Sequence, residues 1–190
     1  HEGIDITPLK RNSAGKPLDP TNAISNGAVA YVNSKAGNSN YGKYIVLEHL
    51  WDSGPIYSLY AHLSETSVKA GQAINQGQQI GVLGYTGAGL NSTRAHLHLE
   101  LSLLLSTRFQ TWYDKYYDSS NNHGNHSGIN MVGLDFAAFY LAKKNNPKLT
   151  LPKFVRTIPI HYKVTVPRKA DLEILMRYPW LAKGKIQKST

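Results

Sequence analysis

Two histidines and a glutamate alternate with leucines near the middle of the chain, at His96, His98 and Glu100. Strict alternation is typical of a half-buried β-strand, so these three side chains are expected on one face and the leucines in a core. The two imidazoles would stand roughly 6–7 Å apart. Histidine is the commonest metal ligand and the side chain best suited to proton transfer near neutral pH. The run predicts a metal or proton-transfer site, the alternative being strand histidines with structural partners.

A second pair of potential ligands stands at the start of the chain, where Gly3 lies between His1 and Asp5. Glycine lets the backbone turn, so both side chains could reach one point. The chain has no cysteine, so a metal must be held by histidine or carboxylate side chains. The alternative interpretation of His1 and Asp5 is a disordered terminus.

Short apolar runs separated by glycine turns must position these residues. We expect strands over residues 27–32, 44–49 and 56–63, shorter ones over 67–72 and 74–81, and then the strand that carries His96 and His98. Regularly spaced short strands indicate an antiparallel sheet or sandwich. Tyr60 and His62 share a face in this pattern, which would direct His62 toward the other histidines, whereas His49 is expected to be a structural, hydrogen-bonded residue.

The second half of the chain is less regular. Residues 103–117 suit a strand extension or a short helix, and residues 118–130 have the composition of an exposed loop that leaves His123 and His126 in solvent. Apolar residues at helical spacing predict a helix over 135–144. Beyond it, residues 158–166 alternate as a strand with His161 on its polar face, and 169–178 suit a short amphipathic helix.

Charge divides the chain into two parts. Residues 1–142 hold 9 Lys/Arg and 10 Asp/Glu, whereas residues 143–190 hold 12 and 2. We therefore predict a body over 1–142 and a basic C-terminal extension over 143–190, a strand plus a short helix that dock on the body. Such asymmetry suits an anionic partner such as an acidic polymer or a membrane surface, or simply a solvated basic face without a dedicated partner. No run approaches the ~20 apolar residues of a membrane span, and no nucleic-acid recognition motif is evident.

Several segments together resemble the lysostaphin-type zinc metallopeptidases, the peptidoglycan endopeptidases with H-x-x-x-D and H-x-H motifs. The order and approximate spacing of the motifs match over roughly residues 1–141, and the segments that carry the resemblance are residues 1–5, 41–46, 59–64, 68–72, 77–81, 84–87, 96–100 and, less specifically, 132–136. The resemblance implies a mainly β fold of the duplicated-hybrid type, with antiparallel sheets forming a groove and a short helix.

The resemblance also implies a division of roles. His1, Asp5 and His98 would hold one Zn²⁺ per chain, and His62 and His96 would be the catalytic histidines that flank it. Three protein ligands plus an open position are typical of a catalytic zinc site. Glu100 is expected to support the site rather than act as the general base. Which of His62 and His96 handles the water and which the leaving group stays open.

Three features depart from the family pattern. The approach to H-x-H contains Arg94, which would contact a substrate carboxylate or only cap the loop, and Tyr60 is a second candidate for substrate binding. The loop 88–91 is longer than usual and could reshape the cleft. The family's upstream strand and its active-site tyrosine would precede His1.

The sequence therefore predicts a zinc endopeptidase that cuts stem or cross-link peptides of bacterial peptidoglycan, in the periplasm or outside the cell. The alternative is a non-catalytic peptidoglycan-binding or hydrolase-activating module of the same fold, and a basic nucleic-acid binder ranks far behind both. The peptide bond cleaved, glycyl or D-alanyl, is not readable from these residues.

Overall fold

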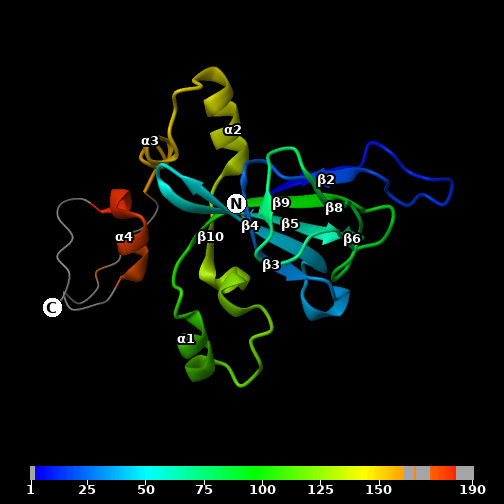
Figure 1. The fold of residues 1–190 in the computed structure, drawn as a ribbon, viewed down its shortest axis with the longest axis horizontal. Coiled ribbons are helices and arrows are strands. Elements are labelled where there is room, and N and C mark those ends of the chain that lie inside the picture. The colour runs from blue at the N-terminus through cyan, green and yellow to red at the C-terminus, as the bar shows by residue number, and fades with distance from the viewer. Residues whose placement is uncertain (1–2, 161–164, 166–171, 183–190) are drawn as a thin grey trace.

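The computed structural model describes residues 3–160, 165 and 172–182 (Figure 1). Ten strands and four α-helices are assigned in this part of the chain. The strands are β1 (Ile4–Ile6), β2 (Pro20–Asn22), β3 (Gly27–Asn33), β4 (Lys43–Trp51), β5 (Gly54–Leu63), β6 (Glu65–Thr66), β7 (Ala73–Ile74), β8 (Gln79–Val82), β9 (Leu97–Leu104) and β10 (Met131–Gly133). The helices are α1 (Phe109–Tyr116), α2 (Phe136–Asn145), α3 (Leu151–Val155) and α4 (Glu173–Arg177). None of these helices is long and apolar enough to cross a membrane.

The large sheet is antiparallel and has the order β1-β9-β5-β4-β3-β7, with β10 pairing the far end of β9. A small sheet of order β2-β8-β6 covers one of its faces. The two faces differ in character. One packs aliphatic side chains such as Ile45, Leu47 and Leu99 against the small sheet, while the other carries tyrosines, His98 and Glu100. The mainly β, antiparallel architecture predicted from the sequence is confirmed.

Three strands confirm their predicted ranges closely, because β3, β4 and β5 follow the alternating apolar runs. Residues 67–72 form a connection rather than a strand. The turn at Gly71 has a φ of 82°, and its N–H donates to the carbonyl of Val29. The strand and helix alternatives for 103–117 both apply in part, since β9 continues to Leu104 and α1 begins at Phe109.

Helix α2 confirms the prediction for 135–144. It begins where the Asp135 carboxylate accepts a hydrogen bond from the Ala138 N–H at 2.9 Å, a standard N-cap contact. The expected strand over 158–166 is wrong at its start, because residues 158–160 are not in a strand. The rest of the predicted range, residues 161–164 and 166 with His161 among them, lies outside the described residues. The predicted helix over 169–178 corresponds to the shorter α4, and α3 was not anticipated.

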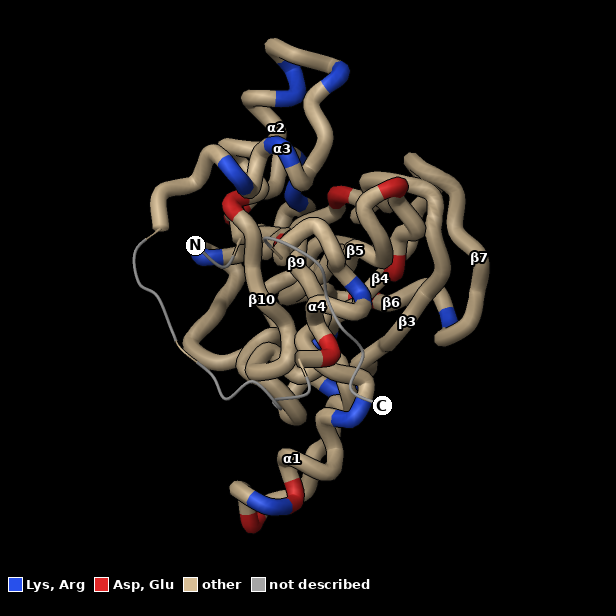
Figure 2. Tube along the Cα trace, turned by 90° about the vertical axis from the view of Figure 1, so that its left-hand side faces the viewer, with Lys and Arg blue, Asp and Glu red and all other residues tan. Residues whose placement is uncertain are grey.

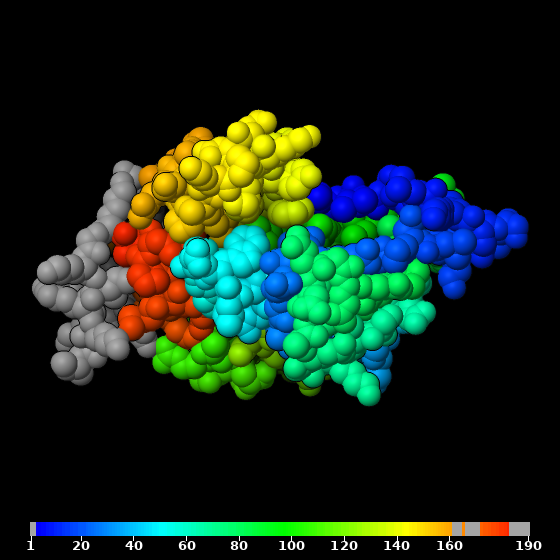
Figure 3. All heavy atoms as spheres, turned by 45° about the horizontal axis from the view of Figure 1, so that its top comes forward, coloured from blue at the N-terminus to red at the C-terminus, as the bar shows by residue number. Residues whose placement is uncertain are grey.

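The described part of 143–182 packs against the body. Leu151, Phe154 and Tyr178 join a core with Ile56 and Leu101 of the large sheet. Figure 3 shows α4 and the residues after it (red) lying against the β4–β5 hairpin (cyan), with α2 (yellow) above. The boundary at residue 142 stays a prediction, since one core includes side chains from both sides of it.

Candidate active site

Strand β9 presents His98 and Glu100 on the polar face of the large sheet. The two are linked, because His98 Nε2 lies 2.9 Å from Glu100 Oε1. The same carboxylate oxygen accepts a hydrogen bond from the Tyr41 hydroxyl at 2.6 Å, and the Tyr41 ring stacks on the His98 ring with 5.8 Å between centroids. Glu100 is buried, so this carboxylate holds the imidazole in one orientation. The hydrogen bond to Glu100, together with that to Asp5, raises the pKa of His98 against the opposing effect of burial.

The register of β1 against β9 brings Asp5 directly opposite His98. Asp5 Oδ1 lies 2.8 Å from His98 Nδ1 and 3.5 Å from His96 Nε2, and the Asp5 side chain is 61% exposed. Burial acts to raise the pKa of Asp5, but the hydrogen bond with His98 and the nearby imidazoles outweigh it, so the pKa is lowered overall. One carboxylate oxygen is therefore shared by two imidazoles.

His62 reaches this point by breaking the alternation of β5. It has a φ of 63°, and no other described non-glycine residue has a positive φ. Such a conformation costs on the order of 1–3 kcal/mol and persists where surrounding contacts hold it. Here the His62 N–H donates to the carbonyl of Tyr41, and Nδ1–H donates to the carbonyl of Thr86 at 2.8 Å. The left-handed backbone places the His62 ring 4.8 Å from that of His96 and 5.9 Å from that of His98.

His62 and His96 are held in the same tautomer. The Nδ1–H of His96 donates to the carbonyl of Arg94 at 2.8 Å, as that of His62 does to Thr86. A carbonyl oxygen can only accept, so in the neutral form of each ring Nε2 carries the lone pair. Burial lowers the pKa of His62 and so favours this neutral form. Two imidazoles beside one carboxylate can then accept and return protons.

Tyr60 is not part of this group, and its predicted contact with substrate is contradicted by its burial. Its side chain is 0% exposed, and its hydroxyl accepts from the N–H of Ile24 at 2.9 Å inside the apolar core. Tyr60 faces the core because it keeps the alternation of β5 that His62 breaks. Arg94 is exposed, and its guanidinium donates to the carbonyl of Gly89 at 3.0 Å, which is the loop-capping role; contact with substrate stays a proposal.

The other histidines lie elsewhere. His49 is buried, as expected of a structural residue, with Nδ1 bonded to the carbonyl of Asn26 at 2.8 Å and Nε2 2.7 Å from Ser58 Oγ. His123 and His126 are half-buried rather than in solvent, because the loop that carries them folds back onto tyrosines of the sheet.

Sequence reasoning missed the contributions of Tyr41 and Thr86. Both lie in segments that carry the family resemblance, but their roles depend on contacts with residues far along the chain. Tyr41 fixes Glu100, and Thr86 anchors His62 while its hydroxyl accepts from the Lys43 N–H at 2.9 Å. A short Gly-Tyr-Thr-Gly run, residues 84–87, was the available signal.

The donor chemistry of the site fits a zinc ion in part. Zn–N and Zn–O bonds of about 2.0–2.2 Å allow two ligands of one ion to lie as close as Asp5 Oδ1 and His98 Nδ1 do. A ligand imidazole commonly gives its other N–H to a carboxylate, as His98 does to Glu100. The third predicted ligand, His1, lies outside the described residues, and within residues 3–160, 165 and 172–182 no cluster of three or more candidate ligands is present.

The antiparallel sheet thus brings the Asp5 carboxylate close to the imidazoles of His62, His96 and His98. The model of peptidase family M23 matches residues 1–109, more than half of the chain. The chain therefore belongs to peptidase family M23.

Three curated relatives illustrate the similarity. An uncharacterized metalloprotease of Haemophilus influenzae is 36% identical over 104 residues, which cover 54% of this chain and 18% of the relative. The peptidoglycan DD-endopeptidase ShyA of Vibrio cholerae is 44% identical over 61 residues, 32% of this chain and 13% of ShyA. Lysostaphin of Staphylococcus simulans is 38% identical over 81 residues, 43% of this chain and 15% of lysostaphin. The chain thus spans less than a fifth of the length of each.

Solved structures include similar chains. The catalytic domain of lysostaphin from Staphylococcus simulans is 25% identical, with a TM-score of 0.44, over 70% of this chain and 74% of that one. A zinc-containing peptidase from Vibrio cholerae is 26% identical, with a TM-score of 0.38, over 53% of this chain and 32% of that one.

Proposed function

We propose that this chain is a zinc-dependent endopeptidase that hydrolyses peptide bonds in the stem or cross-link peptides of bacterial peptidoglycan. Membership of peptidase family M23 supports peptidase activity, and ShyA is by name a peptidoglycan endopeptidase. The observation that carries the proposal is the convergence of Asp5, His62, His96 and His98, since the polar atoms and rings of these residues lie within a few ångströms of one another. Such a substrate places the protein at the cell envelope, in the periplasm or outside the cell.

Asp5 and His98, with His1 as third ligand, would hold the ion. Zinc supplies Lewis acidity and makes hydroxide available near neutral pH. Glu100 accepts the Nε2–H of His98. In the neutral ring Nδ1 therefore carries the lone pair that would bind the ion. Glu100 is buried and engaged by both His98 and Tyr41, so it serves as an orienting group rather than as the general base.

Proton transfer falls to His62 and His96. Each has its Nδ1–H fixed on a backbone carbonyl, so each directs Nε2 outward as an acceptor in the neutral form. One of them would take a proton from the attacking water, and the other would give a proton to the leaving amine or hydrogen-bond the developing oxyanion. The two rings have the same tautomer, so each can take either role.

The test is digestion of purified peptidoglycan by the zinc-reconstituted protein. We expect about one zinc per chain, new free amino groups, and fragments whose masses identify the bond cleaved. Replacing His98 with Ala should remove both the metal and the activity. Replacing His96 with Ala should lower the rate about 10²–10⁴-fold while the zinc stays bound, because only a proton-transfer group is lost.

Two outcomes would contradict this function. A protein that carries its zinc and binds peptidoglycan without releasing amino groups would be the non-catalytic, hydrolase-activating module. Full activity in His98→Ala would show that the ligands are wrongly assigned. Leu50→Ala is a matched control, because Leu50 is an exposed apolar residue at the β4–β5 turn, at the far end of β5 from His62.

An anionic wall polymer is a second partner that we propose for the extension 143–190. Lys144, Lys148 and Lys153 are exposed, and Figure 2 shows Lys and Arg positions gathered around α2 and α3. Exchanging these three lysines for glutamine should weaken wall binding in low salt and reduce its salt dependence, measured by cosedimentation. Unchanged binding would indicate a solvated basic face without a dedicated partner.

A further inference from the structure

A polar cavity adjoins the candidate active site on the same face of the sheet. It has a volume of about 570 Å³, and its lining includes Tyr41 and Glu100, the two residues that orient His98. The opposite wall is formed by Ser127, Gly128 and Ile129, in the loop that connects α1 to β10. Asp5, His62, His96 and His98 do not line it, so a molecule in this cavity would lie beside the two residues that orient His98, with Tyr41 and Glu100 between it and that ring.

The wall belongs to a part of the chain beyond the family match, which ends at residue 109. His123 ties it to the sheet. Its Nε2–H donates to the carbonyl of Asn38 at 3.0 Å, which leaves Nδ1 to accept from the Tyr44 hydroxyl at 2.9 Å. The Asn130 side chain holds the other end by donating to the carbonyls of Ser106 and Asn125, both at 2.8 Å. The loop is therefore a fixed wall with its own polar anchors.

The chemistry of the lining selects among peptide segments. No lysine or arginine is present among the described lining residues, and Glu100 is a carboxylate. A carboxylate side chain entering the cavity would lose water without gaining a cationic partner. The Glu100 carboxylate favours an ammonium group instead, and the hydroxyl and amide groups of Ser39 and Asn40 suit a peptide backbone.

We propose that residues 123–130 form a substrate-binding wall of the active site, and that the cavity takes peptide residues next to the scissile bond that are neutral or carry an amine, not a carboxylate. This inference rests on the proposed function, because it takes the peptide substrate of that same site as the occupant. His123 is a positioning residue, since it acts through Tyr44 and the loop rather than by touching the reacting atoms.

Gly128 offers the sharpest test of the wall. A Cβ at this position would lie 3.6 Å from the Tyr41 hydroxyl oxygen and 3.7 Å from its Cε2, ordinary contacts, and its backbone is outside the left-handed region. Gly128→Ala is therefore compatible with the fold, and Gly128→Leu projects an apolar branch into the cavity. Ala70→Leu is the matched control, since Ala70 is exposed in the connection between β6 and β7.

The experiment measures binding by calorimetry in the His96→Ala background, so that no cleavage intervenes. The probe is the mixture of soluble cross-linked peptides that an amidase releases from peptidoglycan, used with its amines acetylated or succinylated. We expect Gly128→Leu to bind the acetylated peptides at least tenfold more weakly than the parent, Gly128→Ala a few-fold more weakly, and Ala70→Leu equally. Succinylation, which adds carboxylates, should weaken binding to the parent at least tenfold relative to acetylation.

Equal binding by the parent and both Gly128 variants would overturn the wall, and equal binding of succinylated and acetylated peptides would overturn the charge preference. A parent that binds none of these peptides would overturn the peptide occupant. The proposed function fails separately, if the unsubstituted protein releases no amino groups from peptidoglycan while the Gly128 pattern of binding is still observed.

His123 is tested in the same background by its two replacements. His123→Phe keeps a ring but loses the contacts with Asn38 and Tyr44, whereas His123→Gln can restore hydrogen bonds at that point. We expect Phe to weaken peptide binding severalfold and Gln to recover most of the loss. If both replacements weakened binding equally, or if neither weakened it, His123 would not be a positioning residue.

Discussion

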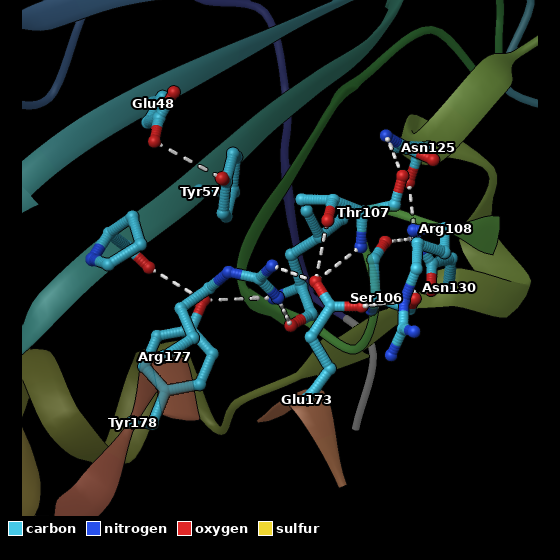
Figure 4. A network of polar contacts seen from close by, with 12 residues as sticks. Glu48, Tyr57, Ser106, Thr107, Arg108, Asn125, Asn130, Glu173, Arg177 and Tyr178 are labelled. Atoms are coloured by element: carbon cyan, nitrogen blue, oxygen red, sulfur yellow. Dashed lines mark hydrogen bonds and ion pairs between the residues drawn. The ribbon is translucent and has the colours of Figure 1, made fainter. Parts of the chain in front are cut away.

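Two regions of the molecule, one within β9 and one past its end, are each organised around a carboxylate that accepts several fixed hydrogen bonds, but the purposes differ. In the first half of β9, Glu100 accepts from the Tyr41 hydroxyl and contacts His98 Nε2. Past the end of β9, Glu173 of α4 accepts from the Ser106 hydroxyl and from both the N–H and the hydroxyl of Thr107 (Figure 4). Glu100 orients His98, a proposed metal ligand, whereas Glu173 attaches one segment of the chain to another.

The difference lies in what surrounds each carboxylate. Glu100 sits within the strand, and its principal partner is an imidazole that must remain available to a third group. Glu173 is bonded to backbone and hydroxyl donors and to Arg177, whose guanidinium also donates to the carbonyl of Leu104 at 2.9 Å. These contacts therefore attach α4 to the segment that follows β9. The comparison predicts that changes at Glu100 affect metal and activity, whereas changes near Glu173 affect stability.

The largest effect is expected for Glu100→Gln. The amide keeps the shape of the side chain but loses the charge that supports the Nε2–H of His98, so zinc affinity should fall about 10–100-fold. Competition with a chelator measures this directly. Glu65→Gln, at an exposed position of β6, is a control for the same change elsewhere. Unchanged zinc affinity in Glu100→Gln would place Glu100 outside the metal site.

Tyr178→Phe should act on stability instead. The Tyr178 side chain is buried, and its hydroxyl donates to the carbonyl of Pro55 at 2.7 Å and accepts from the N–H of Leu104 at 3.1 Å. Removing the hydroxyl leaves both backbone groups without this partner, which should lower the free energy of unfolding by about 1–3 kcal/mol in urea titrations. Activity per folded molecule should not change. A loss of zinc in this variant would contradict the prediction that Glu100 acts on metal binding and the region around Glu173 on stability.

The smallest effect is the pH dependence contributed by Glu173. Burial acts to raise its pKa, but the hydrogen bonds from Ser106, Thr107 and Arg177 outweigh it and hold the pKa well below the ordinary value of 4.5. A depressed folded-state pKa contributes stability above the unfolded pKa, and this contribution is lost as the pH falls below it. Glu173→Gln should therefore be less stable than the unsubstituted protein by about 1 kcal/mol near neutral pH, with the gap closing on acidification below about pH 4. A gap that is constant with pH would contradict the assignment.

Local patterns in the sequence were sufficient for the longer strands and for the shared face of two candidate site residues. Alternation between 96 and 101 predicted the strand β9 and the shared face of His98 and Glu100, because the side-chain period of a strand is a local property. Apolar residues at helical spacing predicted α2 for the same reason. The motif order was enough to predict the family, which the match over residues 1–109 confirms.

Tertiary structure decided the direction of the His62 side chain and the position of the loop over residues 118–130. Tyr60 and His62 were predicted on one face, yet the left-handed backbone at His62, held by contacts to Tyr41 and Thr86, sends the two side chains to opposite sides. The composition of residues 118–130 indicated an exposed loop, yet His123 and Asn130 fold it against the sheet through partners that are distant in sequence. The sequence determined which side chains each strand carries. Where β5 breaks its alternation, and which loop packs on the large sheet, depend on contacts between residues far apart in the chain. A local pattern does not contain such contacts.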